Sequence, residues 1–150
     1  MEEAEIKRLV KDLWSHETKA VGEAWQKLST ESRESRKVEQ FLPELMKMVE
    51  DENSYVRNRG LLLTAANIRG AEANFLEKNL PIYLRCLADE KAITARQCLK
   101  GLAEIAMVKP EWRETIGTAV RKMKVDQYTE SMRPLIEKDR RVLQEILLNK

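Results

Sequence analysis

Glycine, proline and cysteine are scarce in this chain of 150 residues, which has five, four and two of them. So few glycines and prolines leave long stretches free to form helix, and no segment alternates apolar and polar residues for long enough to predict a strand. The two cysteines, Cys86 and Cys98, are too few for a disulfide framework. Both lie on expected apolar helix faces, so we expect buried, reduced thiols.

Long apolar runs are also missing. No stretch approaches the roughly 20 apolar residues that a membrane helix needs, and the acidic residues 1–5 lack the apolar core of a signal peptide. We therefore expect a cytoplasmic protein that does not enter the membrane. The net charge is only +2, from 27 basic and 25 acidic residues, which gives no strong field for nucleic acid or an anionic bilayer.

Motifs that carry chemistry are absent from the sequence. His16 is the only histidine, and no HExxH or CxxC spacing, dinucleotide-binding glycine pattern or phosphate-binding loop occurs. The sequence therefore predicts no catalytic residues, no metal site and no cofactor. Two binding functions, described below, rank ahead of an enzyme with a small-molecule substrate. Such an enzyme is the third alternative and would need a deep pocket with a perturbed carboxylate.

Apolar residues recur at helical spacing along the whole chain, so we expect a single all-α domain over residues 1–150. The expected helices cover residues 3–14, 15–28, 38–50, 54–68, 73–88 and 91–108, followed by a helix from 110 and a final helix after a turn at 128–132. Ser15 is the expected N-cap of the second helix, and residues 29–37 are an expected loop. Pro43 should delay or bend its helix, and Pro81 should break or bend its helix. The helix at 54–68 is apolar nearly all round, which predicts a central position.

One segment of the chain occurs twice. Residues 41–52 and 79–90 share Leu-Pro and Asp-Glu at a shift of 38, and the following segments continue the echo at a shift of 37. A repeat of this length predicts a helical unit that buries its apolar face by stacking on copies of itself.

This pattern resembles the HEAT repeat of the armadillo-like α-solenoids over residues 38–106. The resemblance rests on a proline in each first helix, an aspartate in each turn and an arginine early in each second helix: Pro43 and Pro81, Asp51 and Asp89, Arg57 and Arg96. It implies a right-handed α-α superhelix of about four HEAT-like helix pairs. It also implies a noncatalytic scaffold that binds a protein or peptide partner on the concave face, which the second helices line.

A stripe of polar or small residues recurs at the same repeat phase on three second helices. The candidate binding residues on this stripe are Lys27, Arg57, Thr64, Asn67, Gln97 and Glu104. The alternative interpretation is that the stripe is only the solvated side that any helix needs. Gly60 and Gly101 lie on the same stripe, inside helices, and indicate either a close backbone approach or a surface role.

The charges of this stripe favour a protein or peptide partner over nucleic acid. Lys27 and Arg57 are balanced by Glu23 and Glu104, whereas a phosphate backbone attracts clustered cations. The alternative is a nucleic-acid-binding HEAT-like protein related to the DNA-alkylation-repair glycosylases, in which the resemblance implies a basic concave face with aromatic residues. Seven basic residues near the C-terminal end could also meet an acidic partner, or simply be solvated: Arg121, Lys122, Lys124, Arg133, Lys138, Arg140 and Arg141.

Overall fold

The computed structural model describes residues 1–149, which form eight α-helices and four 3₁₀ segments. The α-helices are α1 (Glu3–Asp12), α2 (Thr18–Glu34), α3 (Leu42–Val49), α4 (Ser54–Ala66), α5 (Ala73–Leu84), α6 (Ala92–Val108), α7 (Arg113–Lys122) and α8 (Arg133–Leu148). The 3₁₀ segments are η1 (Lys37–Phe41), η2 (Ile68–Gly70), η3 (Arg85–Ala88) and η4 (Pro110–Trp112). No strand occurs in this part of the chain, so the all-α prediction is confirmed.

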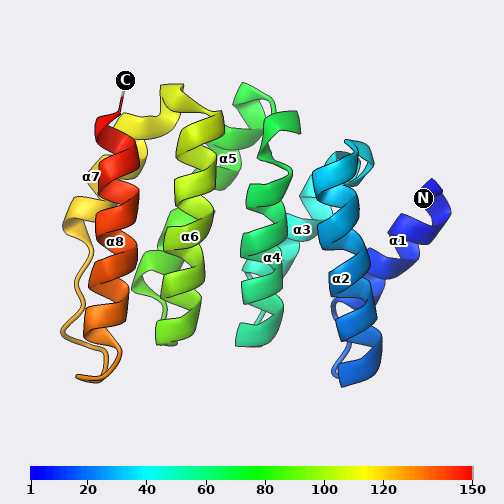
Figure 1. Ribbon diagram of the computed structural model, residues 1–150, viewed down its shortest axis with the longest axis horizontal. Helices are drawn as coiled ribbons and strands as arrows, with labels where there is room; N and C mark the ends of the chain where they lie inside the picture. Colours follow the sequence, from blue (N-terminus) through cyan, green and yellow to red (C-terminus); the bar gives the residue numbers. More distant parts are fainter. Residues whose placement is uncertain (150) are drawn as a thin grey trace.

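The helices form two layers (Figure 1). In one, α2, α4, α6 and α8 stand side by side and run in the same direction; we call it the second-helix layer. The helices that precede them, α1, α3, α5 and α7, make the first-helix layer. In the second-helix layer α4 packs extensively on α6, and α6 on α8, whereas α2 packs much less extensively on α4.

The hydrophobic core consists of two clusters that meet at α3 and α4. Leu45 of α3 and Val56 and Leu63 of α4 pack with α1 and α2. Met46 of α3 and Leu61 of α4 pack instead with the helices that follow. Because α4 buries side chains in both directions, the central position predicted from its apolar circumference is confirmed.

Capping and proline placement explain several helix ends. The side chain of Asn53 caps α4, because its Oδ1 accepts hydrogen bonds from the backbone N–H groups of Tyr55 and Val56 at 2.9 and 3.3 Å. Pro43 lies in the first turn of α3 and Pro134 in the first turn of α8. A missing N–H costs nothing there, so the late start expected at Pro43 is confirmed.

Two predictions about α2 were wrong. The hydroxyl of Ser15 accepts a hydrogen bond from the N–H of Glu17 at 3.0 Å, and α2 begins only at Thr18. The expected loop at 29–37 is helical as far as Glu34. Its composition is polar, but Ser32 is buried, so packing overrides the loop-like composition there.

Pro81 does not break α5, so the predicted break there is wrong. The helix continues through Pro81 to Leu84 and then tightens into η3. The echoed segments consequently differ in local structure, because Leu45–Val49 is α-helical whereas Cys86 and Leu87 belong to a 3₁₀ segment.

The two cysteines are both buried and unpaired, as predicted. Burial raises the pKa of the Cys86 thiol to about 11 and the pKa of the Cys98 thiol well above its ordinary value. Both thiols are therefore protonated at neutral pH and chemically inert. Across residues 1–149, no helix has both the length and the apolar character needed to cross a bilayer.

Candidate functional site

The predicted stripe does not form one exposed surface. Arg57, Thr64 and Asn67 are buried, with 9%, 1% and 0% of their surface exposed. A partner that docks on the folded protein would barely contact these three side chains. They were offered as binding residues because they are polar, but polar residues also join helices to one another.

The glycines of the stripe show what it faces. A Cβ on Gly60 would lie 2.8 Å from the carbonyl oxygen of Leu45 in α3, and a Cβ on Gly101 would collide with the hydroxyl of Tyr83 in α5. The close backbone approach that the sequence predicted as one of two explanations is confirmed at Gly60, whereas at Gly101 the tip of a side chain packs against the glycine. This part of the stripe therefore packs on the first-helix layer, where small residues are needed, and does not face solvent.

Arg57 joins two turns. Its Nη1 donates hydrogen bonds to the carbonyl oxygens of Asp51 and Glu52 at 3.0 and 2.9 Å. Its Nη2 donates to Oδ2 of Asp89 at 3.0 Å, and the same oxygen accepts the N–H of Lys91 at 2.9 Å. The guanidinium thus holds the turn before α4 against the turn before α6.

Asn67 joins α4 to α2. Its Nδ2 donates to the hydroxyl oxygen of Ser32 at 3.0 Å and to the carbonyl oxygen of Leu63 at 2.8 Å. The Asn67 Oδ1 and the Thr64 hydroxyl are buried without a hydrogen-bond partner among the residues described. The contact with Ser32 holds the C-terminal ends of the two helices together.

The other three predicted residues lie on two helices. Lys27 is exposed on α2, in a shallow hollow that it shares with Glu23 and Thr30. Gln97 of α6 is partly buried, and Glu104 of the same helix is exposed. Desolvation of its carboxyl group raises the pKa of Glu104. Gln97 and Glu104 are seven residues apart, on one face of α6, whereas Lys27 belongs to α2.

A groove of about 550 Å³ opens instead between the N-terminal halves of α2 and α4. We call it the Trp25 groove, and its lining residues are Ser15, His16, Thr18, Val21, Gly22, Trp25, Asn53, Tyr55 and Arg59. A Cβ on Gly22 would meet nothing within 4 Å. A larger side chain at this position would therefore project into open space in the groove.

Two aromatic side chains and one arginine give the groove its chemical character. Tyr55 is 69% exposed and Trp25 is partly buried. The Nη1 of Arg59 donates to the carbonyl oxygen of Leu13 at 2.6 Å, and no ion pair among residues 1–149 includes Arg59. Desolvation lowers the pKa of Arg59, but a guanidinium stays charged at neutral pH. The groove thus combines aromatic surface with a cation that has donors to spare.

The sequence analysis missed this groove. It gave no role to Trp25, Tyr55 or Arg59. The signal that could have revealed the groove is Gly22. A glycine inside a helix costs about 1 kcal/mol relative to alanine, so its presence there needs a reason. Gly22 also lies one helical turn before Trp25, on the same face of the helix.

The Trp25 groove has one histidine, His16, which is exposed. Within residues 1–149, no three His, Cys, Asp or Glu side chains are grouped so that they could hold a metal ion.

Comparisons of the chain with protein-family models, with curated proteins and with solved structures found no match.

Proposed function

We propose that the protein is a noncatalytic HEAT-like scaffold that binds a short segment of a protein partner in the Trp25 groove. The observation that carries the proposal is the meeting of Trp25, Tyr55 and Arg59 around one open groove. In this proposal, about four helix pairs form a right-handed α-α superhelix. The second-helix layer is its concave side.

The arrangement of the helices supports the HEAT-like part of the proposal. Successive second helices of an α-solenoid run in the same direction, as α2, α4, α6 and α8 do (Figure 1). The two arginines at the repeat's arginine position each reach forward to an aspartate of the following pair. Arg57 meets Asp89 at 3.0 Å, and Arg96 meets Asp139 at 2.7 Å.

The side chains of the groove support the binding part. Tyr and Trp offer large contact areas at a small cost in conformational entropy, and together with Arg they are enriched at the energetic centres of protein interfaces. A groove of about 550 Å³ holds a few side chains and not a folded domain. The fitting ligand is an extended segment with one or two apolar side chains for Trp25 and Tyr55. A carbonyl or carboxylate oxygen of that segment would accept from Arg59.

Selection from a random peptide library tests the proposal, with Gly22→Trp as the blocking variant. The indole would occupy the groove, whereas Gly22→Ala adds only a methyl group to open space and serves as the matched control. Peptides enriched on the wild type should bind the alanine variant equally well and the tryptophan variant at least about ten-fold more weakly. Circular dichroism should give the same helical signal for all three proteins.

Two outcomes would contradict this proposal. Peptides that bind the tryptophan variant as tightly as the wild type do not use the groove. A library that yields no peptide specific for the wild type would show that the groove does not recognise an extended segment.

A further inference from the structure

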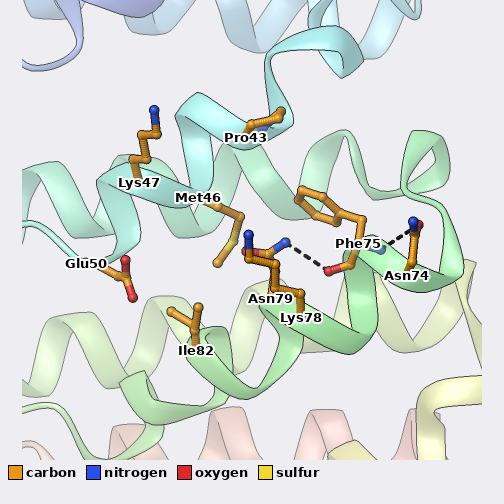
Figure 2. A pocket seen from close by; sticks show the side chains of 9 residues that line it. All are labelled: Pro43, Met46, Lys47, Glu50, Asn74, Phe75, Lys78, Asn79 and Ile82. Atoms are coloured by element: carbon orange, nitrogen blue, oxygen red, sulfur yellow. Dashed lines mark hydrogen bonds between the residues drawn. The ribbon is translucent and has the colours of Figure 1, made fainter.

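Two more grooves lie on the first-helix layer and share no residue with the Trp25 groove. One of about 530 Å³ opens between α3 and α5 and has Met46, Phe75 and Ile82 along it (Figure 2). The other, of about 250 Å³, opens between α1 and α3. Lys47 of α3 lines both, so the grooves flank one helix and adjoin each other.

Both grooves have apolar floors. In the α3–α5 groove, Met46 is 5% exposed, and Phe75 turns its ring toward it across the space between the helices (Figure 2). In the α1–α3 groove, Val10 and Phe41 are buried and Trp14 is partly buried. The smaller groove has room for one large apolar side chain, and the larger has room for one or two.

The rims of the two grooves are basic. They carry four lysines and two glutamates, a net charge of +2: Lys7, Lys11, Lys47 and Lys78 against Glu44 and Glu50. None of these six side chains takes part in the seven ion pairs of residues 1–149, in which every cation is an arginine or the N-terminal ammonium and neither Glu44 nor Glu50 is the acid. Flexible lysines without carboxylate partners favour an anionic ligand.

We propose that these two grooves form one docking surface for an acidic segment of a partner protein. The segment places an apolar side chain in each groove, across α3, and its carboxylates meet the rim lysines, with Lys47 at the centre. This surface is separate from the Trp25 groove, and neither proposal depends on the other. Apolar floors confer affinity, while the charge of the rim selects an acidic sequence over a basic one.

The placement of exposed apolar residues favours a protein segment over an anionic membrane. A membrane surface is bound by apolar side chains that protrude among cations. The large apolar residues that are exposed all lie in the second-helix layer: Tyr55, Ile93, Met107, Val108, Leu135, Val142 and Leu148. The apolar groups beside the four lysines are recessed in grooves, where they can receive side chains but cannot insert into lipid.

The test uses two peptide libraries against the whole protein. Each peptide carries two phenylalanines at varied separation in a Gly/Ser background, with glutamates in one library and lysines in the other. The acidic library should yield binders and the basic one should not. Amide shifts in ¹⁵N spectra of the protein should then map the best acidic peptide to α1, α3 and α5.

Lys47→Glu is the informative variant, and Lys100→Glu is its matched control because Lys100 is exposed on α6 in the other layer. Reversing the charge at Lys47 should weaken the best acidic peptide about ten-fold or more, and binding should also weaken with added salt. Lys100→Glu should change the affinity less than about two-fold, as a surface charge outside the interface does. Gly22→Trp should leave this affinity unchanged, which separates the surface from the Trp25 groove.

Several results would overturn this inference. One is equal enrichment from the two libraries, and another is shifts confined to the second-helix layer. A third is equal loss of affinity in the two lysine variants. Binding to phosphatidylserine vesicles that is weakened by Lys47→Glu, without binding to any acidic peptide, would assign the surface to a membrane instead.

Discussion

The α4–α6 junction is closed, whereas the α2–α4 junction is open at one end, although α4 belongs to both. On the α6 side, the Thr94 hydroxyl donates to Oδ1 of Asn58 at 2.7 Å, and Gly101 brings α6 close to Ala65. On the α2 side, Asn67 and Ser32 join only the C-terminal ends. The Trp25 groove lies between the N-terminal halves of that pair.

The comparison shows that polar and small residues on a central helix have two distinct uses. On the α6 side they close the contact between helices. On the α2 side, the polar link at Asn67 joins only the C-terminal ends of the two helices. At their N-terminal halves, aromatic and cationic side chains surround open space. The sequence pattern alone does not separate these uses, since both interrupt the apolar positions of α4 with polar or small residues.

Breaking the closed junction at Arg57 should have the largest effect. Arg57→Met leaves Asp89 without its cation, and both side chains of this pair are 11% exposed. Removing one partner of such a pair should lower the free energy of unfolding by about 3 kcal/mol, measured by urea denaturation. Arg59→Met is the control from the open junction and should cost less than about 1 kcal/mol.

Equal losses in the two arginine variants would show that Arg57 has no special structural role. A loss of peptide binding in Arg59→Met at unchanged stability would sharpen the contrast. The two arginines are separated by one residue on α4, yet one would serve the fold and the other the ligand.

A methyl group at Gly101 should have the next largest effect. The added Cβ would collide with the Tyr83 hydroxyl, which donates to the carbonyl oxygen of Leu61 at 2.7 Å. We expect Gly101→Ala to destabilise the protein by about 2 kcal/mol, because overpacking outweighs the better helix propensity of alanine. The melting temperature and urea midpoint should both fall.

Tyr83→Phe provides the check on this mechanism, because it removes the colliding oxygen. In that background, Gly101→Ala should cost clearly less than in the wild type. Additive losses would mean that the collision is relieved in some other way.

The link at the closed end of the α2–α4 junction should contribute a smaller amount. In a double-mutant cycle with Ser32→Ala and Asn67→Ala, the coupling free energy should be about 1 kcal/mol, as for a buried neutral hydrogen bond. The stabilities of the four proteins come from urea curves with a common slope. A coupling near zero would mean that the two helices are held together by apolar packing alone.

Much of the fold could be predicted because helical periodicity reports which face of a helix is buried. The number of helices and the central place of α4 followed from apolar spacing, and the late start of α3 followed from Pro43. The end of α2 did not follow, because residues 29–34 are polar by composition and their helix depends on packing with distant segments, such as Ser32 with Asn67.

The candidate site could not be predicted in the same way. The stripe at Arg57, Thr64 and Asn67 had the right periodicity, but a polar stripe can face solvent or a neighbouring helix. The exposure of Tyr55 depends on the gap between α2 and α4, which is a tertiary property. Gly22 is the one residue whose type, a glycine inside a helix, indicated this gap from the sequence alone.

The smallest effect, and the one with the opposite sign, is expected at Gly22. Gly22→Ala places a methyl group in open space, so only the helix propensity changes, and stability should rise by up to about 1 kcal/mol. The same substitution at Gly101 should lower it, and the two variants measured side by side compare the open and closed junctions directly. A destabilising Gly22→Ala would mean that α2 lies closer to α4 in solution than the groove requires, and the Trp25 groove would then be closed in the free protein.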